Sequence, residues 1–411
     1  MTDELRPRLR PIQAVPYDSG GERLIYLRDT SGVSKKTLVL PLRTFYVVAL
    51  MDGTRTLRDI QTEYARRFGD ILLTESIAEV VTRLDEALML EGARAEAARR
   101  GLAEEFARAP TRKAAHAGAA YPARPQGLVE MLEGFFRGRQ GPGPIDRTTE
   151  GRTVAAIAAP HIDFKRGGTA YAHAWKALAE GCPAEVFVVL GVTHEPTESL
   201  YILTEKPFET PLGLVGCDRT FAQELRRRAE LRTGAEELTH RQEHSIEFQA
   251  VWLRYVFGSL RPARIVPVLC GSIPEAAKGG DPQALPEVAR FTSALRGLLE
   301  EYGERAAVVA SVDLAHVGRQ FGDDAAPDDG LTAQVEREDR ELLGHAERMD
   351  AAGFYAHNAA SGDRRRVCGL SALYTLLNAL PARRGRLLHY GQAVTRETQS
   401  LVSFAAMAFE R

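Results

Sequence analysis

Four short apolar segments, most of which end at polar side chains, restrict the fold of this chain more than any other feature. They cover residues 153–159, 185–190, 264–270 and 306–311, and they are rich in valine, isoleucine and alanine. Segments without a regular alternation of apolar and polar residues are typical of strands that are covered on both faces. We therefore expect an α/β fold with a mixed or mostly parallel sheet, covered by helices on both faces.

Polar groups follow three of these four segments. His161 follows the first, His194 follows the second, and Asp313 and His316 follow the fourth, whereas the third ends at Cys270 and a glycine. In open α/β sheets, ligands bind in the crevice beyond the carboxyl ends of the strands. We therefore expect several strands to deliver polar side chains to one site.

Two further groups stand at expected helix starts. His244, with Glu243 and Glu247 beside it, occupies the first turn of one expected helix, so these side chains should be exposed or face a site. Cys368 precedes another apolar helix that begins at Leu370. The free amides and the dipole at a helix N-terminus favour a thiolate.

Two imidazoles and a thiolate, from His161, His194 and Cys368, form a ligand set that iron, copper or zinc accepts. A single histidine is more often structural than a ligand, but the recurrence of histidines at element ends favours a site. The other histidines lack this placement, and we expect them to be structural or surface residues: His173, His240, His345, His357 and His389.

Composition excludes several classes of protein. The chain has 411 residues and a formal net charge of -2, which gives no electrostatic case for nucleic acid, and its length favours two domains. No apolar run approaches the roughly 20 residues that a membrane span requires, and residues 1–7 lack the apolar core of a signal peptide, so we expect a cytoplasmic protein. The four cysteines are widely separated, which argues against disulfides.

The chain divides into a small domain over residues 1–91, a helical linker over 92–112, and a large α/β domain over 113–411. In the small domain we expect strands at residues 24–29 and 37–41. Three helices should follow, over residues 42–51, 57–68 and 75–90, with Thr56 capping the second.

The small domain resembles the PqqD family in residues 50–60 and 84–90. The resemblance implies a winged-helix-like α+β domain that holds a peptide, by pairing a strand with it, for a radical-SAM enzyme. The simpler alternative is a generic helical docking module. DNA binding is less favoured, because no basic recognition face is apparent.

Residues from about 112 to the C-terminus resemble the Memo family, whose fold is similar to that of LigB-type class III extradiol dioxygenases. The residues that carry the resemblance are Ala115–Gly118 (AHAG), Ala159–His161 (APH), Leu190–His194 (LGVTH), Thr210–Gly213 (TPLG), Glu243–Glu247 (EHSIE), Ser311–His316 (SVDLAH), Cys368–Gly369 (CG) and Tyr390–Gln392 (YGQ). The resemblance implies a pocket that binds iron or copper, formed here by His161, His194, His244 and Cys368. Asp313 and His316 match neighbouring pocket residues.

The resemblance also implies partners and marks one departure. Prokaryotic relatives are called AmmeMemoRadiSam system protein B because they accompany a radical-SAM protein and an AMMECR1-like protein. Such a partnership agrees with a peptide-holding small domain. Family members often have a second histidine or another polar residue after the position of His194, where this chain has Glu195. This change affects the metal preference or the charge of the pocket rim.

Three functions follow from these residues. The first is a non-haem iron or copper oxidoreductase, related to extradiol dioxygenases, in which His244 or His316 moves a proton and Asp313 orients it. Because LigB-type enzymes use two histidines and a carboxylate, Cys368 argues against ordinary ring cleavage. The second is a non-catalytic peptide- or protein-binding scaffold that presents a peptide to a partner enzyme. The third is a hydrolase that uses a bound metal to activate water. The chain offers no nucleophilic serine elbow, so any hydrolysis would depend on the metal.

Overall fold

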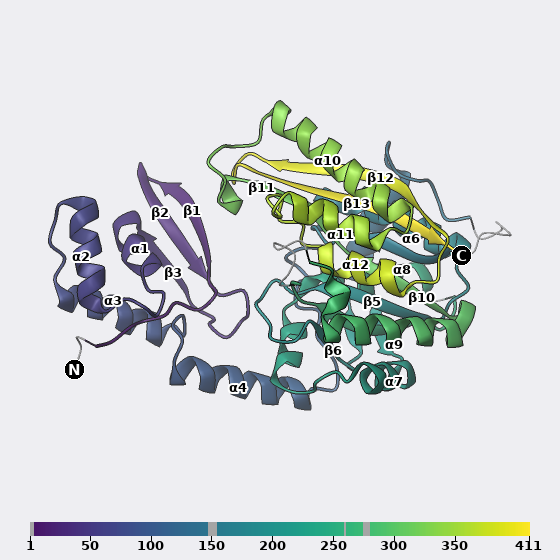
Figure 1. Ribbon diagram of the computed structural model, residues 1–411, viewed down its shortest axis with the longest axis horizontal. Coiled ribbons are helices and arrows are strands. Elements are labelled where there is room, and N and C mark those ends of the chain that lie inside the picture. The colour runs from purple at the N-terminus through teal and green to yellow at the C-terminus, as the bar shows by residue number, and fades with distance from the viewer. Residues whose placement is uncertain (1–3, 147–153, 259, 274–279) are drawn as a thin grey trace. The chain divides into compact units, whose positions relative to one another are not determined.

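The computed structural model describes residues 4–146, 154–258, 260–273 and 280–411. The chain forms two compact units, Met1–Arg108 and Ala109–Arg411. Figure 1 shows the elements of both units. Thr153, the first residue of the first expected strand, lies outside the described residues.

The smaller unit contains a three-stranded antiparallel sheet in the order β1-β2-β3. Its strands are β1 (Gln13–Ser19), β2 (Glu22–Arg28) and β3 (Thr37–Pro41). The sequence predicted β2 and β3 but not β1, which contains Pro16. A proline is tolerated here because β1 is an edge strand, in which some backbone N–H groups have no partner strand to bind.

Four helices complete the described part of this unit. They are α1 (Leu42–Ala49), α2 (Leu57–Phe68), α3 (Thr74–Glu86) and α4 (Ala93–Arg108). Helix α1 packs against β2 and β3. The predicted cap of α2 is confirmed, because the Asp59 N–H donates to Thr56 Oγ1 at 3.2 Å and the Thr56 N–H donates to the Asp59 carboxylate at 2.9 Å. Buried side chains from the sheet and from α1, α2 and α3, such as Leu27, Val48 and Ile60, form one core.

The larger unit is built on a ten-stranded mixed sheet, as the apolar segments predicted. The strand order is β11-β13-β4-β10-β5-β9-β8-β7, with β12 beside β13 and β6 beside β9. Strands β4, β10, β5, β9 and β8 are parallel to their neighbours in this group, and the remaining pairs are antiparallel. The bounds are β4 (Val154–Ala159), β5 (Val186–Val192), β6 (Tyr201–Leu203), β7 (Phe208–Thr210), β8 (Gly213–Cys217), β9 (Arg264–Cys270), β10 (Ala306–Ser311), β11 (Asp313–Gly318), β12 (Arg384–Thr395) and β13 (Ser400–Glu410).

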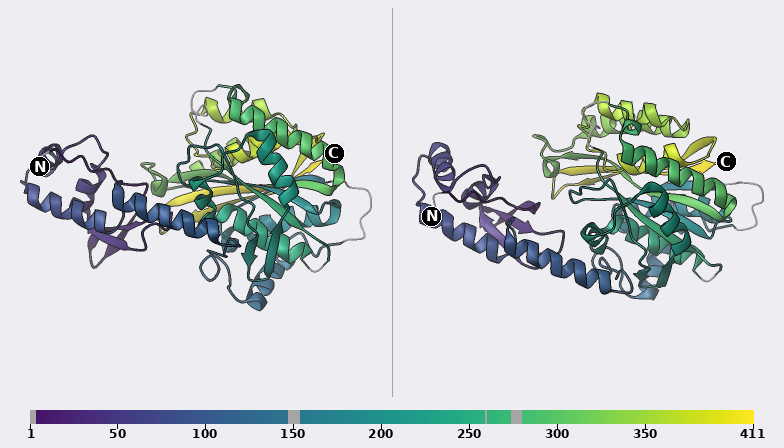
Figure 2. Two further views of the ribbon diagram at one scale, coloured as in Figure 1. Left: turned by 90° about the horizontal axis from the view of Figure 1, so that it is seen from below. Right: turned by 60° about the horizontal axis from the view of Figure 1, so that its bottom comes forward.

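Helices cover both faces of this sheet, and Figure 2 shows the two layers. One face packs against α5 (Pro125–Arg137), α6 (Phe164–Gly181) and α8 (His244–Phe257). The other packs against α7 (Arg219–Ala229), α9 (Pro286–Tyr302), α10 (Asp329–Glu347), α11 (Ala351–Ala360) and α12 (Leu370–Ala379). Short 3-10 helices occupy Ala235–Arg241, Pro282–Ala284, Gly303–Arg305 and Arg319–Phe321.

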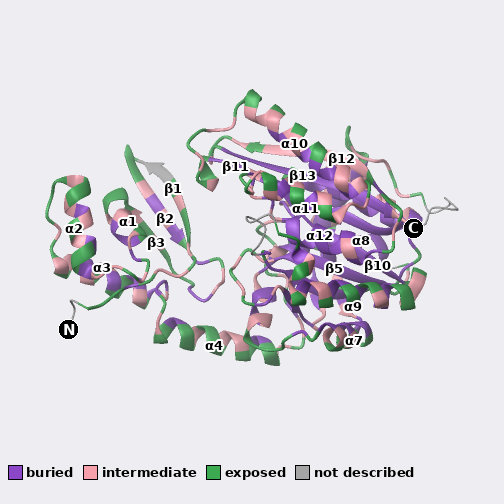
Figure 3. Cartoon of the chain, viewed as in Figure 1, coloured by how far each residue is buried: buried purple, intermediate pink, exposed green. Residues whose placement is uncertain are grey.

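The two layers explain why the central strands lack polar residues. In β5, Val188 and Leu190 face one apolar core, and Phe187 and Val189 face the other. Every residue of β5 is buried, and the interior of the sheet is coloured accordingly in Figure 3. The fold class that the sequence predicted is therefore confirmed. None of the helices in the described residues is long and apolar enough to cross a membrane.

The buried ring of Phe187 should be a main contributor to the stability of the larger unit. It is fully buried on the central strand β5 and stacks on Phe257 with ring centroids 5.3 Å apart. Phe187→Ala should lower the free energy of unfolding of this unit by about 3–5 kcal/mol, because it leaves a cavity that neighbours cannot fill. Urea titration measures the change. Leu260→Ala, at a side chain that is 60% exposed, is the control with little effect. A loss below about 1 kcal/mol for Phe187→Ala would contradict the prediction.

Candidate metal centre

The order of the central strands brings the predicted site residues together. Strand β10 lies between β4 and β5, and Ser311 pairs with Ala159, so that Asp313 and His161 each stand two residues beyond this pair. The His161 N–H donates to Asp313 Oδ1 at 3.0 Å. His194 follows β5 on the other side of β10. The carboxyl ends of three parallel strands therefore supply one site.

His161 and Cys368 are in direct contact. His161 is 2% exposed, and its Nε2 lies 3.2 Å from Cys368 Sγ. Its Nδ1 lies 3.0 Å from the carbonyl oxygen of Ser311. Because a carbonyl can only accept, Nδ1 carries a hydrogen, and in the neutral ring Nε2 holds the lone pair that faces the sulfur.

One buried carboxylate orients the two other histidines. Glu243 Oε2 lies 2.9 Å from His194 Nδ1, and Glu243 Oε1 lies 3.2 Å from His244 Nδ1. The two rings stack with centroids 4.8 Å apart and planes 17° apart. Glu243 also caps α8 by accepting from the Ser245 N–H at 2.9 Å. Glu243 thus holds both Nδ1 atoms and leaves both Nε2 atoms available.

Among the residues that the structure describes, two groups of side chains have donor atoms close enough to hold a metal ion. In the first, donor atoms of His161, His194 and Cys368 all lie within 4.8 Å of one another. In the second, His194 and His244 are grouped with Glu243. Glu243 already makes a hydrogen bond with His194 Nδ1 and lies 3.2 Å from His244 Nδ1, so contacts with the rings already engage both of its oxygens. The first group is therefore the better metal site.

A close backbone contact sets the position of Cys368. The residue lies just before Gly369, the N-cap of α12, as the sequence predicted. The Gly369 N–H donates to the carbonyl of Asp313 at 3.1 Å. A Cβ at Gly369 would stand 2.5 Å from the Cβ of Val312, so a larger residue would push the loop off the strand. Glycine here lets the thiol reach His161.

The charges of His161 and Cys368 are coupled. Burial opposes ionisation of the Cys368 thiol, but His161 and His316 beside it lower its pKa to about 5. Burial likewise opposes protonation of His161, yet the charges of Asp313 and Cys368 raise its pKa to about 9. Without a cation the pair is a thiolate and an imidazolium at neutral pH. A metal ion would replace the imidazolium proton.

The two stacked histidines differ in charge. Burial and the neighbouring charges of His194 and His161 hold the pKa of His244 well below its usual value, so its ring is neutral at pH 7. Burial opposes charge at His194 too, but Glu243 raises the pKa of His194 well above its usual value. His194 carries the charge of the pair, and His244 is left as a proton acceptor.

Asp313 and His316 differ from their expected pairing. The sequence analysis made Asp313 the orienting partner of His244 or His316, but its Oδ2 lies 3.6 Å from Nε2 of His161. The partner of His244 is Glu243. The His316 ring faces the Leu314 carbonyl at 3.0 Å and packs edge-on against Phe321. His316 therefore influences Cys368 by its charge and belongs to neither group of donor atoms.

Sequence reasoning missed the roles of Glu243 and His116 and misplaced Glu247. The His116 ring lies 5.7 Å from that of His244, with its Nε2 2.7 Å from the Gln242 carbonyl. Glu247 was expected to be exposed or to face the site, but it is fully buried in an ion pair with Arg112. It also accepts from the N–H of His116 at 2.9 Å. The motif carries a glutamate at each end, and this repetition was the available sign that the two carboxylates have different buried partners. Glu243 lies beside two histidines, and Glu247 pairs with Arg112.

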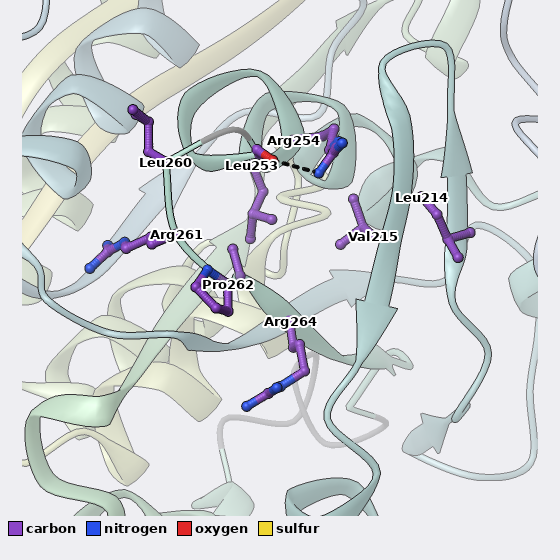
Figure 4. A pocket seen from close by; sticks show the side chains of 10 residues that line it. Leu214, Val215, Leu253, Arg254, Leu260, Arg261, Pro262 and Arg264 are labelled. Carbon is purple, nitrogen blue, oxygen red and sulfur yellow. Dashed lines mark hydrogen bonds between the residues drawn. The ribbon is translucent and has the colours of Figure 1, made fainter.

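A separate pocket of about 450 Å³ contains none of the predicted site residues. It lies at the amino end of β9, the opposite edge from the histidines, and Figure 4 shows its lining. Its arginines are engaged, because Arg254 donates to the carbonyls of Leu212 and Gly258, and Arg264 pairs with Asp218. This pocket offers no comparable group of reactive side chains.

The fold and the site together define an α/β protein with a candidate metal centre at the carboxyl edge of a mixed sheet. Comparison with known families identifies the family of the chain. The chain belongs to the Memo family, because residues 112–408 match the family described as Memo-like protein. The match spans nearly all of the larger unit and includes every residue of the candidate centre.

Relatives of different lengths were found. A MEMO1 family protein of Aquifex aeolicus is 28% identical over 409 residues, which cover 98% of this chain and all of the relative. A MEMO1 family protein of Methanopyrus kandleri is 32% identical over 312 residues, which cover 73% of this chain and 99% of the relative. A third, from Thermus thermophilus, is 28% identical over 354 residues, or 86% of this chain and 98% of the relative. The Methanopyrus protein therefore has no counterpart of about a quarter of this chain.

Cys368 should react with iodoacetamide at unusually low pH. Its pKa of about 5 means that the reactive thiolate forms between roughly pH 4 and 6 in chelator-treated protein, whereas an ordinary thiol titrates near 9. Peptide mass spectrometry of the alkylation rate against pH measures the midpoint. Cys217 is the internal comparison, since burial raises its pKa to about 12. His161→Ala should move the Cys368 midpoint upward, and a wild-type midpoint near 9 would contradict the assignment.

Proposed function

We propose that this Memo family protein is a metal-dependent oxidoreductase that holds iron or copper through His161, His194 and Cys368. The observation that carries the proposal is the arrangement of the imidazole nitrogens. The Nδ1 atoms of His161 and His194 are bound to a carbonyl and a carboxylate, and both residues have a nitrogen close to Cys368 Sγ. Histidines that ligate metals are typically fixed in this way through their second nitrogen.

The donor set fits the proposed ions. Imidazole suits iron, copper and zinc, and a thiolate favours copper, zinc and iron over magnesium or calcium. The lowered pKa of Cys368 supplies the thiolate without a further cost of deprotonation. Iron or copper, when bound, would supply one-electron redox chemistry and an open position for a substrate or dioxygen.

The protein's own residues have distinct roles in this proposal. Glu243 holds His194 and His244. Asp313 supports His161, because it accepts a hydrogen bond from the backbone N–H of His161 and lies 3.6 Å from the Nε2 of the His161 ring. His244, neutral at pH 7, accepts a proton at Nε2, because Glu243 engages Nδ1. His316 stabilises the Cys368 thiolate by its charge. The cysteine in place of a third oxygen or nitrogen donor favours a redox reaction other than ring cleavage of a catechol.

We further propose that the smaller unit holds a peptide for partner enzymes, a radical-SAM protein and an AMMECR1-like protein, in the cytoplasm. The unit is compact on its own and has an open edge at β1. The Methanopyrus relative covers 73% of this chain, so a family member can exist without a counterpart of the remainder, which would agree with a separable role for the smaller unit. If the centre proves to be non-catalytic, the same features favour the scaffold function.

Metal content tests the centre directly. Anaerobically purified protein should carry near-stoichiometric iron or copper by mass spectrometry, and His161→Ala, His194→Ala and Cys368→Ala should each lose it, because each removes a donor atom. Metal-dependent oxygen consumption should be lost with it. The control is His173→Ala, whose ring stacks on His389 outside the centre. The proposal fails if folded wild-type protein neither contains nor takes up metal.

The β1 edge can be tested with a pair of variants. Alternate N–H groups of an antiparallel edge strand face the free edge, and the others bind the neighbouring strand. Because proline has no N–H, one of the two variants Ala14→Pro and Val15→Pro removes an outward donor, and the other removes a β1–β2 hydrogen bond. The variant that loses the outward donor should keep its thermal stability but bind peptides from an array at least tenfold more weakly. Equal peptide binding by this variant and wild type would exclude strand pairing at β1.

A further inference from the structure

The loop that carries Cys368 has a backbone that needs support from its surroundings. This cysteine loop, residues 361–369, connects α11 to α12. Two of its residues that are not glycine have a positive φ, Asp363 at 52° and Arg366 at 51°. Such conformations are strained and persist only where neighbouring contacts fix them.

Strand β11 fixes the loop on both sides of Cys368. The His316 N–H donates to the carbonyl of Arg365 at 2.6 Å, and the Gly369 N–H donates to the carbonyl of Asp313 at 3.1 Å. Cys368 stands between these two hydrogen bonds. The distance from its sulfur to His161 therefore depends on how the loop is seated on β11.

A buried ion pair seats the loop. Arg365 is 2% exposed, and its NH1 donates to Asp339 Oδ1 on helix α10, which is fully buried. The Arg365 Nε lies 3.3 Å from Glu338 Oε2. Neither Nε nor NH2 of Arg365 makes a hydrogen bond within the described residues. Asp339 thus accepts a hydrogen bond from the guanidinium, and Glu338 adds a second negative charge beside it.

The second oxygen of Asp339 connects the ion pair to the strands of the site. Asp339 Oδ2 accepts from Ser403 Oγ at 2.5 Å and from Tyr390 Oη at 2.9 Å. Ser403 Oγ in turn accepts from the Ala315 N–H of β11 at 2.9 Å. One carboxylate thus binds the cysteine loop through one oxygen and, through the other, the strand on which that loop lies.

We propose that the Arg365–Asp339 pair is a positioning clamp that sets the Cys368 thiolate against His161 for metal binding. This inference rests on the proposed metal centre. Neither residue contacts the candidate ligands, so both act through the seating of the loop. A forked guanidinium suits this role, because its NH1 donates to Asp339 while its Nε lies beside Glu338, and a lysine ammonium does not reproduce both contacts.

Cobalt substitution tests the clamp through a spectroscopic signal of the cysteine. Cobalt(II) added to chelator-treated wild type should give a thiolate-to-cobalt charge-transfer band that is absent in Cys368→Ser. Arg365→Lys keeps the charge but loses the fork, so it should weaken cobalt binding about 10- to 100-fold and diminish the band, as loss of a supporting partner does in other metal sites. It should also slow iodoacetamide alkylation of Cys368 at pH 7, because the thiol moves away from His161.

A control and a milder variant separate positioning from a general loss of stability. Arg10→Lys alters the buried Arg10–Asp29 pair of the smaller unit and should change neither signal. Tyr390→Phe removes one hydrogen bond to Asp339 and the one that Gln392 donates to Tyr390 Oη, but it leaves the Arg365–Asp339 pair in place. It should give a smaller change in the same direction, and it decides the question if Arg365→Lys does not fold. The clamp is overturned if folded variants keep both wild-type signals. If wild type takes up no cobalt, the metal proposal and the clamp that rests on it both fail, whereas uptake by wild type with an unchanged signal in the folded variants overturns the clamp alone.

Discussion

The pairing of β10 with β4 on one side and β5 on the other is the constraint on which the candidate centre depends. Parallel neighbours end at the same edge, so His161, Asp313 and His194 meet although about 150 residues separate the first two. The same pairing buries the strands on both faces, which accounts for their apolar composition. Stability and site geometry thus come from a single arrangement.

Electrostatics then gives each residue of the centre its state. Glu243 lies beside two imidazoles, but it raises the pKa of His194, whereas burial and the charges of His194 and His161 lower the pKa of His244. The Cys368 thiolate is stabilised by His161 in the same way. The centre therefore holds paired charges in the metal-free protein, and a divalent cation would replace protons and leave the surrounding hydrogen bonds in place.

Support for these side chains comes from residues that no local motif marks. Gly369 allows the cysteine loop to approach β10 and β11 closely, and the buried Asp339 joins that loop to β11 through Arg365 and Ser403. On the other side of the site, the buried Arg112 pairs with Glu247 and donates to the carbonyl of Glu243. These contacts hold backbone segments that would otherwise move independently.

The sequence by itself determined the mixed sheet, the helix cap at Thr56 and the positions of His161, His194 and Cys368 at element ends. These features depend on local hydrophobic patterning and capping, which neighbouring residues in the chain specify. Only the tertiary structure decided that Asp313 supports His161, that Glu243 serves two histidines and that Glu247 is buried against Arg112. The partner of a charged side chain depends on strand order and register, which bring distant residues within a few ångströms and which no local pattern encodes.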